Sequence, residues 1–146
     1  MRFVTECYLS MKQAEIFIDG AAKGNPGPAG IGVVICQNQE VIKNLHQYIG
    51  NATNNVAEYM ALIYALQEAL ILKIENLVIH TDSELLYRQI KKEYKVKSPH
   101  LLGLYNQAVR LLSSFKSVNI RHIPRENNRG ADKLANIAVK EARKKA

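Results

Sequence analysis

The sequence predicts a single α/β domain in which helices flank a mixed, five-stranded sheet. Three strand-like apolar segments come first, separated by polar or Gly/Pro-rich stretches. From about residue 54 the apolar residues follow a helical period, interrupted by two short apolar segments with the length of buried strands. At 146 residues, 47% of them hydrophobic, the chain can bury one core and is too short for two. The expected element order is βββαβααβα.

The first third of the chain is expected to form an antiparallel meander. Its three strands are predicted at residues 13–19, 31–36 and 41–49. In the first strand, alternation places Ile16 and Ile18 on one face. Phe17 and Asp19 lie on the opposite face, where a buried acid needs a partner. The Gly/Pro-rich stretch 20–30 is expected to be the turn into the second strand.

The remaining elements alternate helices with short strands. Thr53, Asn54 and Asn55 each offer an N-cap for a helix over about 54–72. The segments that follow are predicted as strand 77–80, helix 83–94, helix 101–115, strand 118–123 and helix 126–144.

Charge and cysteine content narrow the class of protein. The 20 Lys and Arg against 13 Asp and Glu give a net charge of +7, which suits a polyanionic partner, although it could equally aid solubility. Cys7 and Cys36 are expected to be free thiols in a reducing cytosol. No signal peptide or membrane span is recognisable, so we expect a cytoplasmic protein with no membrane partner. Residues 1–12 are expected to be an N-terminal extension and residues 13–146 the domain.

Four acidic residues stand in contexts where an acid is costly to bury. They are Asp19, Glu58, Asp82 and Asp132. Two of them accompany strand-like apolar segments, and two lie on the inner faces of expected helices. Buried acids are rare unless they are paired or bind a metal. Converging carboxylates can hold two hard divalent cations about 4 Å apart, an arrangement that can drive in-line attack on a phosphodiester.

Simpler explanations exist for three of these acids taken singly. Glu58 could favour the N-terminus of its helix. Asp82 could cap the helix that follows it. Asp132 could be a solvated helical side chain. Because capping and helix-dipole effects explain two of the four at most, whereas a cation site explains all of them, we predict a metal site.

The segments around the acids resemble the type 1 ribonuclease H family. D-G-A-A-K-G-N-P-G-P-A-G, T-N-N-x-A-E, T-D-S and E-N-N-x-x-A-D-x-L-A occur in that family's order, between residue 13 and about residue 140. The resemblance implies the ribonuclease H fold, with the first three strands antiparallel. It also implies endonucleolytic cleavage of the RNA strand of RNA–DNA hybrids, with Mg²⁺ or Mn²⁺, leaving 5′-phosphate and 3′-hydroxyl ends.

The resemblance also implies roles for individual residues. The positions of the family's metal-binding acids, which hold two ions, are occupied by Asp19, Glu58, Asp82 and Asp132. The positions of its substrate-contacting residues are occupied by Gly20, Asn25, Asn54 and Asn55. For the adjacent asparagines helix capping is the alternative, and we expect one of them to cap as well.

The chain departs from the common bacterial pattern in two respects that matter for function. The stretch I-R-H-I-P-R-E-N-N is shorter than a G-H-x-G-x-x-x-N loop, so His122 is expected to end a strand, and Arg125 becomes an alternative for steering phosphate. The long basic protrusion of some members is also missing. Lys91 and Lys92 remain as candidates for gripping the DNA strand, with a solvated helix face as the alternative.

Three other functions stay open at this point. A groove read through its A-like shape could also accept double-stranded RNA. A catalytically silent hybrid-binding module would need one of the acids to be displaced. A 3′-5′ exonuclease or integrase-like nuclease is disfavoured by the T-N-N-x-A-E and Gly/Pro segments. We expect a monomer.

Overall fold

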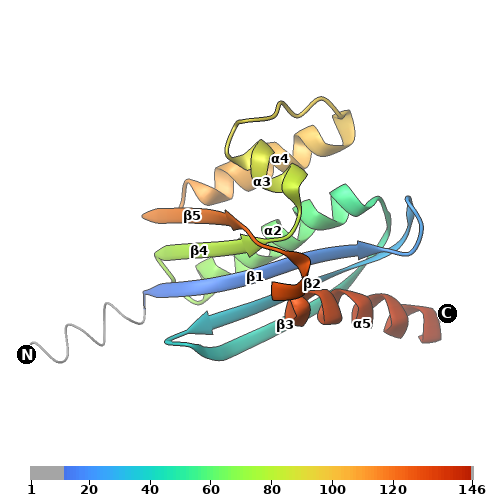
Figure 1. Ribbon diagram of the computed structural model, residues 1–146, viewed down its shortest axis with the longest axis horizontal. Helices are drawn as coiled ribbons and strands as arrows, with labels where there is room; N and C mark the ends of the chain where they lie inside the picture. The colour runs from blue at the N-terminus through green and yellow to red at the C-terminus, as the bar shows by residue number, and fades with distance from the viewer. Residues whose placement is uncertain (1–11, 146) are drawn as a thin grey trace, which may run out of the picture.

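The computed structural model describes residues 12–145, which form a five-stranded mixed sheet with helices on both faces (Figure 1). The strands are β1 (Gln13–Ala22), β2 (Gly27–Gln37), β3 (Glu40–Ala52), β4 (Asn76–Thr81) and β5 (Ser117–His122). Their order in the sheet is β3-β2-β1-β4-β5. The first three strands are antiparallel, and β4 runs parallel to both β1 and β5. The predicted fold class and element order are therefore confirmed.

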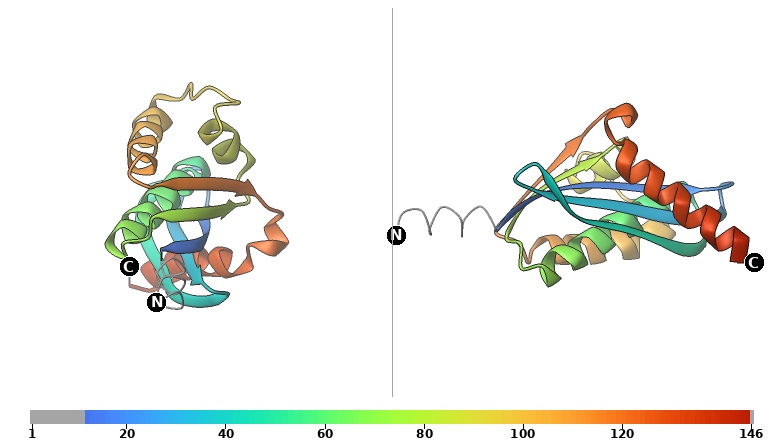
Figure 2. Two further views of the ribbon diagram at one scale, coloured as in Figure 1. Left: turned by 90° about the vertical axis from the view of Figure 1, so that its left-hand side faces the viewer. Right: turned by 90° about the horizontal axis from the view of Figure 1, so that it is seen from below.

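The helices divide between the two faces of the sheet. They are α2 (Asn54–Ile71), α3 (Glu84–Ile90), α4 (Pro99–Leu112) and α5 (Arg129–Lys145). Helix α2 covers one face, with α4 packed beside it, and α5 lies across the opposite face against β1, β2 and β3 (Figure 2). The main core lies between the sheet and α2, where Ile16 and Ile18 meet the buried side chains of Leu62 and Leu66.

The hairpin between β1 and β2 differs from the sequence expectation. Residues 20–30 are not all turn: β1 continues to Ala22, β2 begins at Gly27, and the register runs on to the pair Ala22 and Ala29. The Lys23 N–H donates to the Pro28 carbonyl at 2.8 Å, which closes the short turn that remains. Gly20 and Gly30 of this stretch pack against α2 and α5, so they do not interrupt the strands, whereas Gly24, with φ 101°, belongs to the turn.

Two glycines of this hairpin let the acid-bearing helices approach the sheet. A Cβ at Gly20 would lie 2.3 Å from the Ala57 carbonyl carbon of α2, and one at Gly32 would lie 2.1 Å from the Ala131 carbonyl oxygen of α5. Real Cβ atoms do not come so close to backbone, so a side chain at either position would force the helix outward. The glycines thus set how near the two helices lie to the strands.

Three helix boundaries were predicted wrongly, and one of them is the end of α4, which lies at Leu112 instead of Phe115. Helix α3 ends at Ile90 instead of Tyr94, because Lys92 adopts a left-handed conformation (φ 64°) and the Glu93 N–H returns to the Arg88 carbonyl at 2.8 Å. This C-terminal motif usually carries glycine, so a lysine gave no signal of it. Before α5, a 3₁₀ turn over Arg125–Asn127 takes the place of the predicted first helical turn.

The other sequence expectations concern the thiols and the membrane. Cys36 is half-buried and forms no disulfide, as predicted, whereas Cys7 lies outside the described residues. Among the helices of residues 12–145, none is long and apolar enough to cross a membrane.

Candidate metal-binding active site

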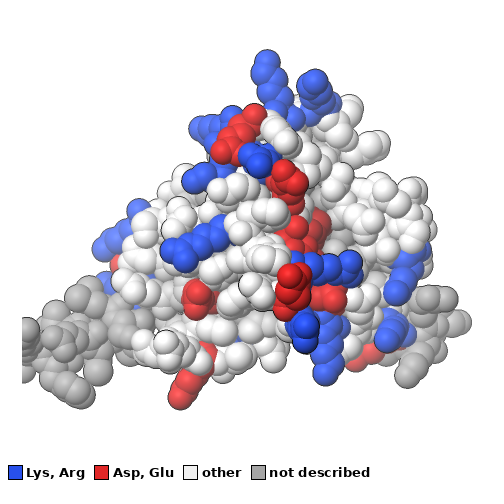
Figure 3. Space-filling model, in the orientation of Figure 1, with Lys and Arg blue, Asp and Glu red and all other residues white. Residues whose placement is uncertain are grey.

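Three carboxylates from distant parts of the chain converge at one edge of the sheet. Asp19 of β1, Glu58 of α2 and Asp82 after β4 each present an oxygen, and these atoms lie within 4.8 Å of one another. With Asp132 of α5 they line a cleft of about 350 Å³. Figure 3 shows acidic side chains near the middle of one face, over the region where β4 and β5 end, with Lys and Arg beside them. The structure thus brings all four predicted acids to one cleft.

Parallel pairing of β1 and β4 explains why two of the acids meet. Ile18 is the register partner of Thr81, so the residues that follow them, Asp19 and Asp82, come to the same edge. Ligand sites in α/β proteins commonly lie at the carboxyl ends of parallel strands. Asp19 is 5% exposed, although carboxylates are rarely buried without a partner.

Glu58 is 8% exposed and faces the sheet from α2. The Gly20 N–H donates to its Oε1. Glu58 is not in the first turn of α2, which contains no acidic residue, so the alternative of a favourable helix-dipole position is wrong. The hydrogen bond from β1 fixes this carboxylate against the strand that carries Asp19.

Asp82 does not cap the helix that follows it. The N-cap of α3 is Ser83, whose hydroxyl accepts a hydrogen bond from the Leu86 N–H at 3.2 Å. The carboxylate of Asp82 instead accepts one from Nδ2 of Asn128 at 3.1 Å. The capping explanation of Asp82 is therefore wrong, and its side chain turns into the cleft.

Asp132 lies in the first turn of α5 and is half-buried, so it is not a fully solvated helical side chain. Nδ2 of Asn136 donates to its Oδ1 at 3.3 Å, and Arg125 approaches the same oxygen at 3.5 Å. Its oxygens do not belong to the group within 4.8 Å. Asp132 thus lies beside the group of three carboxylates. It pairs with Arg125, whose side chain is 77% exposed.

Mutual repulsion and burial act on the acids of the cleft. Burial raises the pKa of Asp19 well above its usual range, and the charges of Glu58 and Asp82 raise it further. Burial also raises the pKa of Glu58, against the opposing effect of the hydrogen bond from Gly20. A divalent cation would remove both penalties, and carboxylate oxygens are the ligands that Mg²⁺ and Mn²⁺ prefer. The donor set therefore fits the metal that the resemblance implies.

The expected substrate-contacting residues divide into two groups. Those lining the acidic cleft are Gly20, Asn54, Asn55 and the auxiliary candidate Arg125. Those that do not line it are Asn25, Lys91, Lys92 and the other auxiliary candidate, His122. His122 ends β5 as predicted, and its ring stacks on Tyr87 with 5.7 Å between centroids.

The asparagines belong to a network that joins the hairpin to α2. Oδ1 of Asn54 accepts from the Ala22 N–H at 3.0 Å, and Oδ1 of Asn25 accepts from the Asn54 N–H at 2.9 Å. The cap of α2 is Thr53, which accepts from the Val56 N–H at 3.2 Å, so the expectation that one asparagine caps is wrong. Because both Oδ1 atoms are committed to backbone donors, the amide NH₂ groups are left as donors.

Sequence reasoning missed Asn128, which is 1% exposed and hydrogen-bonded to Asp82. Its neighbour Asn127 is exposed. Two adjacent asparagines look alike in a sequence, and no periodicity marks which of them is buried in the short segment before α5. The one available indication was that Asn128 lies four residues before Asp132, one helical turn from a predicted metal-binding acid.

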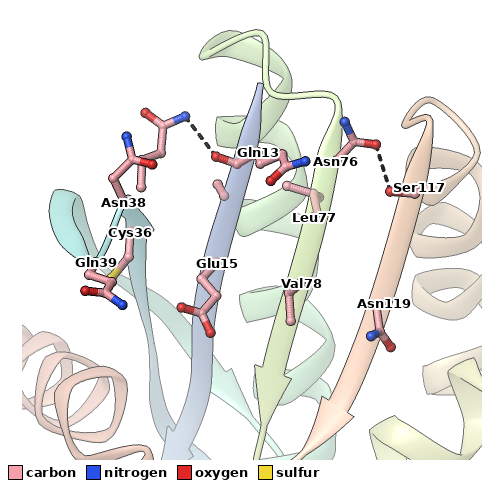
Figure 4. A pocket seen from close by; sticks show the side chains of 12 residues that line it. Gln13, Glu15, Cys36, Asn38, Gln39, Asn76, Leu77, Val78, Ser117 and Asn119 are labelled. Atoms are coloured by element: carbon pink, nitrogen blue, oxygen red, sulfur yellow. Dashed lines mark hydrogen bonds between the residues drawn. The ribbon is translucent and has the colours of Figure 1, made fainter. Parts of the chain in front are cut away.

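A second cavity, also about 350 Å³, lies at the opposite end of the strands (Figure 4). Gln13, Asn76 and Ser117 mark the amino ends of β1, β4 and β5 at its rim. Its lining is dominated by amide side chains and contains Glu15 as its single carboxylate. It shares no residue with the acidic cleft.

The fold and its carboxylate cleft define a class of protein: an α/β domain with a centre suited to divalent cations at the edge where β1 and β4 meet. Residues 17–138 match the protein family described as reverse transcriptase-like. RNase H1 from Halobacterium salinarum has a similar structure, with a TM-score of 0.86 and 36% identity over 88% of this chain and 98% of that one. LC11-RNase H1, solved in complex with an RNA/DNA hybrid, has a TM-score of 0.85 and 40% identity over 88% and 98% of the two chains.

A longer relative matches as well. The bifunctional protein Rv2228c of Mycobacterium tuberculosis is 44% identical over 130 residues, which is 88% of this chain and 36% of the relative. The chain thus spans about a third of the length of this curated relative. These similarities show that the chain belongs to the ribonuclease H family, a family of hydrolases, and confirm the resemblance carried by its motifs.

Proposed function

We propose that this protein hydrolyses the RNA strand of RNA–DNA hybrids with two bound divalent ions, leaving 5′-phosphate and 3′-hydroxyl ends. The observation that carries the proposal is the convergence of the Asp19, Glu58 and Asp82 carboxylates within 4.8 Å in a cleft that Asp132 also lines. The structure of the similar LC11-RNase H1 with an RNA/DNA hybrid supports the choice of substrate.

The four acids are proposed to hold the metal. When bound, Mg²⁺ or Mn²⁺ would supply an activated water and stabilise the leaving 3′ oxygen. The chain contributes a rigid set of ligands, since the Gly20 N–H fixes Glu58 and Asp82 receives a hydrogen bond from Asn128. Asp132, which lies on α5 and is paired with Arg125, is the acid best able to adjust when substrate binds.

Recognition of the RNA strand is assigned to the asparagine network. The amide NH₂ groups of Asn54 and Asn25, whose Oδ1 atoms are committed to backbone donors, can donate to groove acceptors and 2′-hydroxyls. Asn55 and Gly20 also line the cleft. This arrangement reads an A-like minor groove by its shape and its hydroxyls, which does not require a particular base sequence.

The basic side chains are assigned to phosphates. Arg125 lines the cleft, and with 77% of its side chain exposed it can leave Asp132 to contact the scissile region or the product. Lys91 and Lys92 are exposed at the end of α3, where they can contact the DNA strand. Such contacts give affinity that falls with salt and carry no sequence preference.

The test is cleavage of three end-labelled substrates with Mg²⁺, Mn²⁺ or EDTA. They are an RNA–DNA hybrid, double-stranded RNA and single-stranded RNA. We expect metal-dependent internal cuts in the RNA strand of the hybrid. Cuts in double-stranded RNA as well would show the broader activity, while a ladder built from one end would indicate an exonuclease. No cleavage of any substrate by folded protein would contradict the proposal and favour a hybrid-binding module.

Removing one acid supplies the matched control for this test. Asp19→Asn should abolish cleavage, because a neutral amide is a poor ligand for a hard cation, yet hybrid binding should stay equal or become tighter as the negative charge is lost. Cleavage is measured by gel and binding by fluorescence anisotropy. Turnover by Asp19→Asn at the wild-type rate would remove Asp19 from the site.

A further inference from the structure

Asn128 is a polar side chain buried where the chain passes from the 3₁₀ turn into α5. It is 1% exposed. Its Nδ2 donates two hydrogen bonds, one to the Ile18 carbonyl oxygen at 2.8 Å and one to Oδ2 of Asp82 at 3.1 Å. Both amide hydrogens are therefore used. One partner, Ile18, lies where the parallel pairing of β1 with β4 ends, and the other, Asp82, directly follows β4.

The backbone of Asn128 makes a third connection to the site. Its carbonyl oxygen accepts from the Asp132 N–H at 3.1 Å, in the first turn of α5. Since Ile18 directly precedes Asp19, this one residue joins the chain segments of three of the four acids. Asp82 is contacted through its carboxylate, Asp132 through its amide, and Asp19 through the neighbouring carbonyl.

Packing alone does not explain an asparagine at this position. Oδ1 of Asn128 is buried and has no hydrogen-bond partner among the described residues. An unsatisfied buried acceptor is unfavourable, and an apolar side chain of similar volume would avoid it. What an apolar side chain could not do is donate to the Ile18 carbonyl and to the Asp82 carboxylate together.

We propose that Asn128 is a positioning residue that orients the Asp82 carboxylate toward the cation, a role that rests on the proposed function of the cleft. The hydrogen bond to Oδ2 restricts rotation of the carboxylate and leaves the second oxygen directed to the cleft. The bond to Ile18 ties that orientation to β1, which carries Asp19. Loss of such a hydrogen-bonding partner of a metal ligand typically lowers metal affinity or activity by about 10–100-fold.

The experiment compares Asn128→Ala with Asn127→Ala, a matched control in which an exposed asparagine of the same turn is removed. Binding of Mn²⁺ and Mg²⁺ is measured by calorimetry without nucleic acid, and the metal-free melting temperature by circular dichroism. Steady-state cleavage of the hybrid is followed across a metal titration. We expect the metal affinity of Asn128→Ala to fall by about 10–100-fold. The control should keep the wild-type affinity.

Two further readouts separate positioning from a structural role. For Asn128→Ala, kcat should fall at limiting metal and recover at high metal, while KM for the hybrid changes by less than about two-fold, since substrate contacts are untouched. A lower melting temperature with wild-type metal affinity would mean that Asn128 only fastens the segment before α5, and would overturn the proposal.

A measurement on the wild-type protein covers the case in which Asn128→Ala does not fold. The side-chain NH₂ resonances of Asn128 are followed by NMR during a Mg²⁺ titration and compared with those of Asp82→Ala. The chemical shifts of these resonances should change on addition of Mg²⁺ and should differ between the wild type and Asp82→Ala. Chemical shifts that respond neither to Mg²⁺ nor to the substitution would overturn the positioning role of Asn128. Calorimetry and NMR need no cleavage, so wild-type protein without nuclease activity would contradict the proposed function and still leave Asn128 testable.

Discussion

The acids of the cleft show how the burial of single side chains creates a metal requirement. Asp19 and Glu58 are almost fully enclosed, and burial raises the pKa of each above its ordinary range. Without a cation these groups retain protons or pay the cost of an unpaired buried charge. The same enclosure places their oxygens close together, so the arrangement that weakens the metal-free protein is the one that favours a divalent ion.

This balance predicts how pH affects the metal-free protein. Because their pKa values are raised in the folded protein, Asp19 and Glu58 hold their protons more tightly there than in the unfolded chain. Their contribution to the free energy of unfolding is therefore largest below about pH 4, the ordinary range of carboxyl pKa values, and is lost as the pH rises. Each pH unit costs up to about 1.4 kcal/mol per group, a drop of roughly 4–5 °C in the melting temperature. In EDTA the melting temperature should therefore fall between pH 5 and pH 8.

The matched variant for this prediction is Asp19→Asn, which should flatten the fall because one titrating group is gone. Saturating Mg²⁺ should flatten it too, since the metal binds the deprotonated acids. Melting curves by circular dichroism measure both effects. If the melting temperature of Asp19→Asn falls with pH as steeply as that of the wild type, other groups set the pH dependence.

His122 is predicted to contribute little to catalysis. Its ring stacks on Tyr87, and its Nε2 lies 3.3 Å from the backbone oxygen of Asp82, so it is held at the end of β5 and does not line the cleft. His122→Ala should lower kcat by less than about three-fold, whereas removal of a general acid or base costs 100-fold or more, on the order given by measured cases. Single-turnover cleavage at several pH values measures this, and a 100-fold loss would restore His122 as a proton carrier.

Among the secondary-structure elements, α2 and α5 depend on glycine contacts for their distance from the sheet. Each carries one of the four acids of the cleft, and each is met by a strand glycine that has no room for a Cβ. The site therefore depends on backbone packing at positions that carry no functional group. Small displacements of either helix would open the distances between carboxylates and weaken cation binding.

Gly32→Ala should weaken metal binding in the cleft as well as lower the stability of the protein. Its Cβ would meet the Ala131 carbonyl at 2.1 Å, which pushes α5 and Asp132 outward. We expect weaker Mn²⁺ binding and slower cleavage, together with destabilisation of about 1–3 kcal/mol, the usual cost of overpacking. Calorimetry and denaturant unfolding provide the measurements.

The control for this change is Gly103→Ala, on the exposed side of α4 where a Cβ meets nothing within 4 Å. It should raise the free energy of unfolding by about 1 kcal/mol, because alanine favours a helix over glycine. Metal binding and cleavage should be unchanged. Equal metal affinity in Gly32→Ala and wild type would show that α5 does not need this close approach.

The molecule as a whole combines a net charge of +7 with an acidic cleft. Positive side chains outside the cleft attract the phosphates of a nucleic acid, while the cleft itself needs cations before it can accept one. Affinity for the hybrid should therefore fall as the salt concentration rises and increase when divalent ions are added. Both dependences are properties of the charge distribution and not of one residue.

Replacing Lys91 and Lys92 together by Ala should raise KM for the hybrid and leave kcat nearly unchanged. If each lysine neutralises one phosphate, the slope of log KM against log salt should fall by about 2. Lys116→Ala is the control, since Lys116 pairs with Glu75 just before β5, at the end of the sheet opposite the acids. An unchanged slope would mean that the two lysines are a solvated surface.

The class of fold and the four acids of the cleft could be predicted from the amino-acid sequence. Alternation in residues 13–19 and the helical period after Thr53 are local properties, so they can be read without coordinates. The acids stood out because a carboxylate beside an apolar segment has few explanations. The helix end at Ile90 was missed, because its left-handed residue is a lysine and not a glycine.

Which side chains come into contact depends on the packing of the strands and helices. The parallel register of β1 and β4 brings Asp19 to Asp82, and the glycine contacts bring in the helices of Glu58 and Asp132. The same packing buries Asn128 and leaves Asn127 in solvent, a difference that neighbouring identical residues cannot carry in sequence. Distances, burial and pKa values arise from contacts between segments far apart in the chain, and for that reason they follow from the assembled fold.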